Sequence, residues 1–210
     1  MTTLSSSVRI PFVKNKLWQI LLGIFFMTWI YFFVTTRDTT NWWIENILVI
    51  LFFPWFYYLN KRFLLSDLSV ICIFLFLLIH SYGAQMSYTY NQVGAWLQES
   101  YDLSRNPYDR FVHFNFGLLM AYPCLDYLVN RFKVPIKHAY GIMIMFVLSL
   151  ATIFELIEWT IAALTDSETG ETYVATQGDV WDAHKDIALA LLASVIVTMF
   201  HVIYKRKRNS

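Results

Sequence analysis

Six long apolar stretches follow one another along the chain, and polar residues are concentrated in the connections between them. Each stretch is long enough to cross roughly 30 Å of hydrocarbon as an α-helix. The pattern therefore predicts an all-α polytopic membrane protein, with residues 1–210 forming a single domain built as a six-transmembrane-helix bundle. The six expected spans are residues 17–34, 42–59, 66–82, 109–129, 138–163 and 179–204.

Composition points to the same class of protein. Hydrophobic residues make up 57% of the 210 residues, charged residues make up 15%, and the mean hydropathy is +0.46. Soluble domains carry about 25% charged residues, so this chain is unusually poor in charge. Cys72 and Cys124 both lie inside apolar stretches, where we expect free core thiols and no disulfide. The first stretch is long for a signal peptide and no small-x-small cleavage site follows it, which predicts a membrane anchor.

Positive charges alternate along the connections and predict an orientation. Twelve of the 16 Lys and Arg residues lie before the first span, between the second and third, between the fourth and fifth, or after the sixth. The opposite connections carry only Arg37 and Arg105 as cations, and the last of them holds Asp166, Glu168 and Glu171. The positive-inside rule then places both termini in the cytoplasm.

Aromatic residues gather where the expected spans meet the lipid headgroups, which predicts an interfacial belt. One long connection, residues 83–108, contributes some of them, and we expect it to fold back onto the outer membrane surface. The belt residues are Trp42, Trp43, Trp55, Tyr57, Tyr58, Tyr88, Tyr90 and Trp96.

The ionisable residues inside the expected spans share one depth. The predicted orientation places nearly all of them in the outer half of the membrane, and leaves the inner halves almost free of such groups apart from Asp126. Ionisable residues inside a membrane are costly and commonly mark functional sites. The residues of this outer set are Glu45, His80, Asp109, Arg110, His113, Glu155, Glu158, Asp179, Asp182, His184, Lys185 and Asp186.

Their spacing predicts which side chains share a helix face. Asp179, Asp182 and Asp186 stand at i, i+3 and i+7, which puts three carboxylates on one stripe of a helix. Pairs at i, i+3 or i, i+4 give two other spans a polar face. These pairs are Glu155 with Glu158 and Asp109 with His113.

Several carboxylates drawn together out of water cannot all stay ionised unless a positive group joins them. Arg110, Lys185, protons or a bound cation would supply that charge. Carboxylate oxygens with an imidazole suit Mn, Fe, Zn or Mg, and helical bundles build di-metal sites from Glu and His on facing helices. The expected metal ligands are His113, Glu158, Asp182, Asp186 and Asp109, supported by His80, Arg110 and Lys185.

A purely structural interpretation of the same residues stays open. Glu45 at a helix start would complement the helix dipole, and His80 and His184 suit hydrogen bonding near headgroups. The remaining acids would then form a closed salt-bridge network with Arg110 and Lys185. Seven acidic or imidazole groups face those two cations, and the surplus of negative charge favours a functional polar site.

Four segments around these residues belong together. They are residues 80–90, 105–114, 155–159 and 176–186. In combination they resemble the YjdF family of bacterial inner-membrane proteins, which lacks an assigned biochemical function. That family tends to have His where this chain has Gln85, and Glu where it has Asp126. The resemblance implies a multi-pass protein of a bacterial inner (plasma) membrane, and the run 178–186 is also loosely similar to the end of VanZ-like membrane proteins.

Three functions from different classes fit these features. The first is a metal-dependent enzyme acting on a lipid or lipid-linked substrate from the outer leaflet. A metal-activated water would be its nucleophile, and Glu155 or Asp179 its general base or acid. The second is a small cation or proton transporter, although the inner halves lack a polar relay and no paired Gly/Pro-broken helices mark a midplane site. The third is a non-catalytic scaffold or sensor. No Ser or Cys elbow, phosphate loop or nucleotide motif is present, and no nucleic-acid partner is expected.

Overall fold

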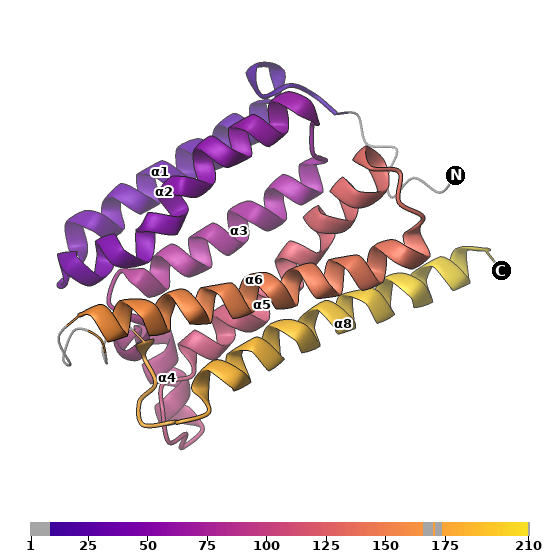
Figure 1. The fold of residues 1–210 in the computed structure, drawn as a ribbon. Helices are drawn as coiled ribbons and strands as arrows, with labels where there is room; N and C mark the ends of the chain where they lie inside the picture. The colour runs from indigo at the N-terminus through magenta and orange to yellow at the C-terminus, as the bar shows by residue number, and fades with distance from the viewer. Residues whose placement is uncertain (1–8, 166–169, 171–173, 210) are drawn as a thin grey trace.

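The computed structural model describes residues 9–165, Gly170 and residues 174–209, and all regular secondary structure in this part of the chain is helical. Six long helices lie side by side and form a bundle (Figure 1). They are α1 Lys16–Thr35, α2 Thr39–Arg62, α3 Asp67–Ala84, α5 Tyr108–Asp126, α6 Ile136–Leu164 and α8 Asp182–Asn209. The shorter elements are the 3₁₀ turns η1 Phe12–Lys14 and η2 Tyr88–Tyr90, the helix α4 Gln92–Ser100 and the π-helical turn η3 Tyr127–Arg131.

Polar residues begin the first three long helices. The side chains of Asn15, Asp38 and Ser66 each accept a hydrogen bond from a backbone amide in the first turn of α1, α2 and α3. Such caps satisfy amides that have no partner inside the helix. The helix starts therefore lie within three residues of the predicted ones, even though the spans themselves are almost uniformly apolar.

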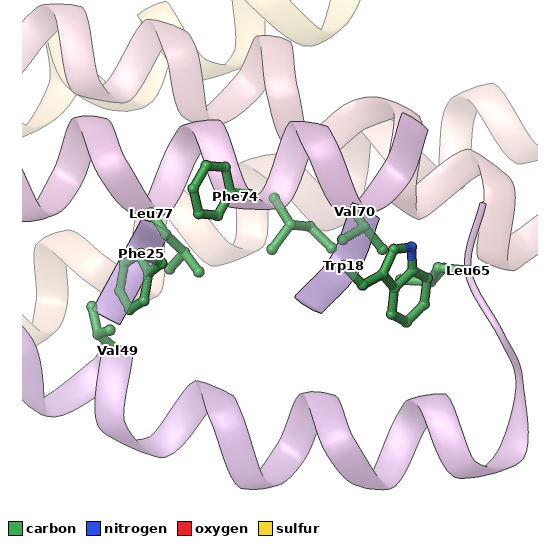
Figure 2. Close-up of a cluster of buried hydrophobic side chains, with 8 residues drawn as sticks. Trp18, Phe25, Val49, Leu65, Val70, Phe74 and Leu77 are labelled. Carbon is green, nitrogen blue, oxygen red and sulfur yellow. The ribbon is translucent and has the colours of Figure 1, made fainter. Parts of the chain in front are cut away.

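Two large apolar cores join the long helices. The first joins α1, α2 and α3 through Trp18, Phe25, Val49, Phe74 and Leu77, which Figure 2 shows between the helices. The second joins α5, α6 and α8 and consists mostly of small and unbranched side chains. Its members include Ala121, Leu125, Ala139, Met143, Val147, Ala151 and Ala190.

Helix α5 packs against α3, α6 and α8 and is the central helix of the bundle. By length and composition, the described residues include five helices that can cross a membrane, namely α1, α2, α3, α6 and α8. Helix α5 is less apolar because it carries Asp109, Arg110 and Asp126. Asp109 and Asp126 are buried, so these acids face protein and not lipid. The protein interior is where a membrane protein tolerates ionisable groups.

The charges separate along the bundle. The start of α1 and the end of α8 lie at the same end as the α2–α3 and α5–α6 connections (Figure 1). That end carries Lys61, Arg62, Lys133, Lys137 and Lys205. The connection that contains α4 and the approach to α8 lie at the other end, which we call the α4 end.

Two residues of the predicted aromatic belt are buried. Trp42 is 0% exposed, and its ring packs 4.7 Å from that of Trp29. Tyr88 is 1% exposed and is hydrogen-bonded to His80. For these two the belt prediction is wrong, because contacts within the bundle bury them. The remaining belt residues are exposed, and they are Trp43, Trp55, Tyr57, Tyr58, Tyr90 and Trp96.

Candidate functional site

Three buried carboxylates meet at the α4 end of the bundle. Asp109 comes from the first turn of α5, and Asp182 and Asp186 come from the first two turns of α8. Each offers an oxygen within 4.8 Å of the other two, and their exposed fractions are 3%, 4% and 1%. The Oδ1 atom of Asp186 has no hydrogen-bond partner. We call these three residues the aspartate triad.

Further acids surround the triad. His113 lies one turn after Asp109 on α5, and its Nε2 atom is 3.6 Å from Asp109 Oδ1 and 3.2 Å from Glu155 Oε1. Glu158, one turn further along α6, is buried and interacts electrostatically with Asp109, Glu155 and Glu45. The two polar pairs predicted from spacing therefore do face the same cluster. The imidazole of His113 lies among six buried carboxyl groups at this end of the bundle. They belong to Glu45, Asp109, Glu155, Glu158, Asp182 and Asp186.

The acidic ladder does not lie on one helix as predicted. Helix α8 begins at Asp182, and Asp179 precedes it, accepting a hydrogen bond from the backbone amide of Trp181 at 3.1 Å. Its Oδ2 atom lies 2.5 Å from Lys185 Nζ and 2.5 Å from Arg110 Nη2. The hydrogen bond from Lys185, with those from Trp181 and Arg110, lowers the pKa of Asp179 to about 2. Asp179 is thus an ionised partner for two cations, and such a carboxylate is a weak base.

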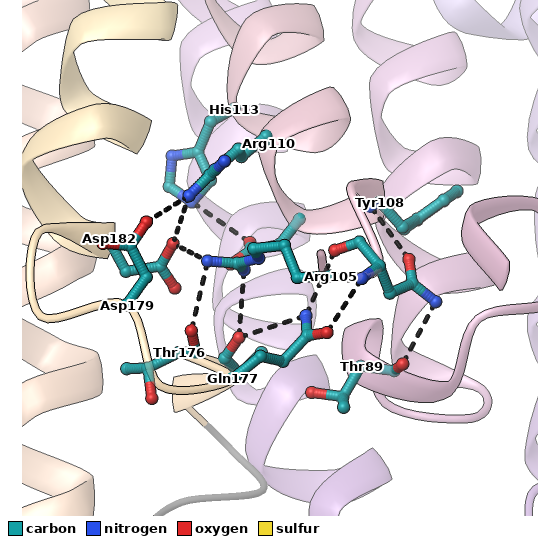
Figure 3. A network of polar contacts seen from close by, with 12 residues as sticks. Thr89, Arg105, Tyr108, Arg110, His113, Thr176, Gln177, Asp179 and Asp182 are labelled. Atoms are coloured by element: carbon teal, nitrogen blue, oxygen red, sulfur yellow. Dashed lines mark hydrogen bonds and ion pairs between the residues drawn. The ribbon is translucent and has the colours of Figure 1, made fainter. Parts of the chain in front are cut away.

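Arg105 lies between the triad and the segment before α8. Its guanidinium donates a hydrogen bond to Asp182 Oδ1 and lies 3.8 Å from Asp109 Oδ2. It also donates to the carbonyl oxygens of Ala175 at 3.0 Å and Thr176 at 3.2 Å (Figure 3). Among the residues that the structure describes, Arg105 is the one buried cation. It therefore links the start of α5, the triad and the approach to α8.

Side-chain amides fasten the two connections at this end. Gln177 accepts a hydrogen bond from the Asn106 backbone amide at 2.9 Å and donates to its carbonyl oxygen at 3.1 Å. The Asn106 side chain donates to the carbonyl oxygens of Thr89 and Asn91 at 3.0 and 2.9 Å (Figure 3). Gly94 allows this approach, since a Cβ there would lie 1.7 Å from Asn106 Oδ1. The connection containing α4 and the approach to α8 thus form one hydrogen-bonded layer.

Tyr88, His80 and Glu45 form a second buried group. The Tyr88 hydroxyl lies 2.6 Å from His80 Nδ1, and His80 Nε2 lies 3.1 Å from the Glu45 carbonyl oxygen. A carbonyl only accepts, so Nε2 carries the proton and Nδ1 accepts from the tyrosine. Burial raises the pKa of Tyr88 well above its ordinary value, which keeps this hydroxyl protonated. Glu45 does not begin its helix as predicted, because α2 starts at Thr39, and the buried Glu45 Oε2 has no hydrogen-bond partner.

Other polar residues that stood out in the sequence lie away from the triad. His184 is exposed and contacts the Trp181 ring. Gln85 donates a hydrogen bond to Thr35. Asp126 lies at the opposite end of the bundle, where its carboxylate is fully bonded. Its partners are Arg9, Ser66, Ser69 and Asn130.

The sequence contained a signal for two site residues that were not predicted. Arg105 and Tyr88 lie in the segments 105–114 and 80–90, which carry the family resemblance. By sequence, Arg105 counts only as a cation of a connection, and Tyr88 belongs to the aromatic belt at the membrane interface. Their burial depends on contacts between connections that neither assignment considers.

Comparison with known proteins agrees with that resemblance. Residues 17–207 match the family described as "Predicted membrane protein (DUF2238)". The chain is also 33% identical over 172 residues to "Inner membrane protein YjdF" of Escherichia coli (strain K12), which covers 81% of this chain and 82% of that protein. No solved structure matches. The chain therefore belongs to this family of predicted membrane proteins, as the four segments predicted.

Proposed function

We propose that this protein is a multi-pass inner-membrane enzyme whose aspartate triad holds a divalent metal ion. The observation that carries the proposal is the triad itself. Asp109, Asp182 and Asp186 each offer an oxygen within 4.8 Å of the others while almost fully buried, and Asp186 Oδ1 has no hydrogen-bond partner. A buried carboxylate oxygen without a partner is costly, and coordination of a cation would remove that cost.

The charge balance around the triad supports a bound cation. Six carboxyl groups are buried at this end of the bundle, and Arg105 is the one buried cation among the described residues. Like charges this close cannot all remain ionised without further positive charge. Oxygen ligands favour Mg or Mn, and the nearby imidazole of His113 also admits Fe or Zn. We propose that the triad supplies the primary ligands, with His113 and Glu158 beside them.

The proposed placement in the membrane makes α5 a sixth span. Its buried acids are enclosed by α3, α6 and α8, so low apolar character does not prevent it from crossing. With six spans the cation-rich end faces the cytoplasm, together with both termini, and the triad faces the outer leaflet. The name of the Escherichia coli relative supports an inner membrane as the location.

We propose that the substrate is a lipid or lipid-linked molecule that reaches the triad from the outer leaflet. A divalent ion held there would act as a Lewis acid and make a water molecule acidic. Glu155 is the best placed general base or acid, because its Oε1 atom lies 3.2 Å from His113 Nε2 and has no hydrogen-bond donor. Asp179 is better suited to hold Arg110 and Lys185 than to exchange a proton.

Transport of a cation or proton has less support. The second apolar core fills the space between α5, α6 and α8 beyond the triad, through residues such as Ala121, Leu125 and Met143. A transported ion needs polar groups along its path. A structural salt-bridge network also accounts for Arg105 and Arg110, but it leaves the buried Asp186 Oδ1 atom without a hydrogen-bond partner.

Metal binding tests the proposal directly. Purified protein, stripped with chelator, would be titrated with Mn²⁺ and the bound ion counted by electron paramagnetic resonance. We expect one saturable site, and its loss in Asp182→Asn and Asp186→Asn. Asp102→Asn removes an exposed acid from the connection before α5 and is the matched control. Absence of saturable binding in the wild type, or equal binding in all variants, would contradict the proposal and favour the structural network.

Enzyme activity requires a separate measurement. Total lipids of cells that overproduce the wild type or Glu155→Gln would be compared by mass spectrometry. A change in a lipid or lipid-linked species that the wild type causes and the variant does not would support the assignment. Identical lipid profiles, together with intact Mn²⁺ binding, would limit the function to cation binding.

A further inference from the structure

Two cations lie at the edge of the aspartate triad and share one carboxylate. Arg110 Nη2 and Lys185 Nζ are each 2.5 Å from Asp179 Oδ2. Arg110 Nη2 also lies 3.5 Å from Asp182 Oδ1, so this edge is in direct contact with the triad. Among the described residues at this rim, two cations face the one carboxylate of Asp179, although the interior beside them, which Arg110 also contacts, is strongly acidic.

Both cations retain hydrogen-bonding capacity. The Lys185 side chain is 49% exposed, and its ammonium has three donors. The Arg110 side chain is 28% exposed, and its guanidinium has five N–H donors. Asp179 holds the two cations near each other. One phosphate, which has several acceptor oxygens, can therefore accept hydrogen bonds from both.

The surface beside these cations is apolar. Val180 is 86% exposed and Trp181 is 60% exposed, and both directly precede α8, whose apolar stretch is long enough to cross a membrane. Exposed aromatic and aliphatic residues at the start of a span are typical of the lipid interface. The positive edge is therefore next to lipid, at headgroup level.

We propose that Arg110 and Lys185 bind the phosphate of an anionic phospholipid headgroup and so present it beside the triad. This inference rests on the proposed lipid chemistry and narrows its substrate to an anionic, phosphate-bearing lipid. The two cations account for the specificity, because their donors suit phosphate oxygens and each Lys or Arg near a membrane favours an anionic lipid.

The test uses a local reporter, since the opposite end of the bundle also carries many cations. In a Cys72→Ala, Cys124→Ala background, Val180→Cys is labelled with a fluorophore. The protein is placed in phosphatidylcholine vesicles that contain a minor fraction of nitroxide-labelled phosphatidylglycerol or phosphatidylcholine. Quenching by the two labelled lipids gives a selectivity ratio at this edge. Each Lys or Arg near a membrane surface favours an anionic lipid by about fivefold.

We expect a ratio well above one, and a fall of about fivefold in Lys185→Gln. Lys137→Gln changes the same charge at the opposite end and should leave the ratio unchanged. A ratio of one in the parent, or no fall in Lys185→Gln, would overturn the proposal.

Metal binding by the same samples separates this inference from the proposed function. Selectivity for the anionic lipid without saturable Mn²⁺ binding would retain the headgroup site and reject the metal enzyme. Mn²⁺ binding without lipid selectivity would retain the metal site and reject the headgroup assignment.

Discussion

Arg105 is the residue on which the charge balance of the cluster depends. It is 6% exposed, and its guanidinium contacts Asp182, Asp109 and two backbone carbonyls. Removing one partner of a buried ion pair leaves the other charge uncompensated. The resulting loss of stability is larger than the net contribution of the intact pair. Arg105 therefore lets two acids lie close together before any metal ion arrives.

Arg105→Met should lower the free energy of unfolding by about 3–5 kcal/mol, because Asp182 and Asp109 lose their buried counter-charge. Lys185→Met also removes a salt bridge, but a half-exposed one, and should cost about 0–1 kcal/mol. Chemical denaturation in detergent micelles measures both. Equal losses in the two variants would contradict the role of Arg105. Saturating Mn²⁺ should restore part of the stability of Arg105→Met.

Asp179 gives a prediction about pH. Its pKa is lowered to about 2 in the folded protein, chiefly by the hydrogen bond from Lys185, and an unfolded aspartate titrates near about 3.9. A lowered pKa stabilises the fold above the unfolded value and loses this effect as the pH falls toward the folded value. The melting-temperature difference between wild type and Asp179→Asn should thus be constant from neutral pH to about 5 and shrink between about 4 and 2. A difference that disappears already at pH 6 would contradict these ion pairs.

The sequence predicted the acids of the site better than their partners. Spacing along one helix is a local property, so Asp182 with Asp186 and Asp109 with His113 were predicted as pairs that share a face. Asp179 was assigned to the same stripe, but the helix begins three residues later. Arg105 lies outside every span, and its burial results from contacts with the approach to α8, which no local pattern records.

At the level of helices, α5 and α8 approach each other closely at Gly117. A Cβ atom at Gly117 would lie 2.1 Å from the backbone oxygen of Ala190, so only glycine permits this distance between the two helices. Asp109 lies on α5, and the other two triad residues lie on α8. The spacing of the triad therefore depends on a glycine more than two turns away.

Gly117→Ala should push α5 and α8 apart, lower the free energy of unfolding by about 1–3 kcal/mol and weaken Mn²⁺ binding. Gly141→Ala is the matched control, since a Cβ there meets nothing within 4 Å and alanine favours a helix. Thermal unfolding and Mn²⁺ titration measure the two effects. Unchanged stability in Gly117→Ala would show that the helices do not need this contact.

Apolar length predicted the long helices well and the connections poorly. The six expected spans correspond to the six long helices, and the all-helical class is confirmed for the described residues. The short elements η2 and α4 inside residues 83–108 were not predicted, because their order comes from Asn91 and Asn106, which bond to backbone groups. Such bonds leave no periodic pattern in the sequence.

For the whole molecule, the polar groups divide the bundle into three zones. One end holds most of the cations, the middle is apolar, and the α4 end holds the buried acids. At the first end Arg9 lies 2.5 Å from the buried Asp126, so even there the buried acid is paired. Within the part of the chain that the structure describes, the excess of unpaired buried acid lies at the α4 end, which is why a cation is expected there.

Whether the triad faces the outside depends on α5 crossing the membrane. Asp102 and Lys133 flank α5, and both are exposed. In the cysteine-free background, Asp102→Cys and Lys133→Cys would be treated with a membrane-impermeant maleimide added to spheroplasts. We expect labelling at Asp102→Cys in intact spheroplasts, and labelling of Lys133→Cys only after permeabilisation. Lys61→Cys should behave like Lys133→Cys, because Lys61 lies in the last turn of α2 and the α2–α3 and α5–α6 connections share one end of the bundle (Figure 1).

Each other outcome has a distinct meaning. Labelling of Lys133→Cys but not Asp102→Cys would keep six spans and reverse the orientation, which would place the triad in the cytoplasmic half and exclude an outer-leaflet substrate. Equal labelling of both positions would mean that α5 does not cross. In that case the polar side of α5 would have to contact water. Its acids, Asp109 and Asp126, lie at its two ends and are too costly to expose to lipid. The position of one helix thus decides which leaflet supplies the substrate.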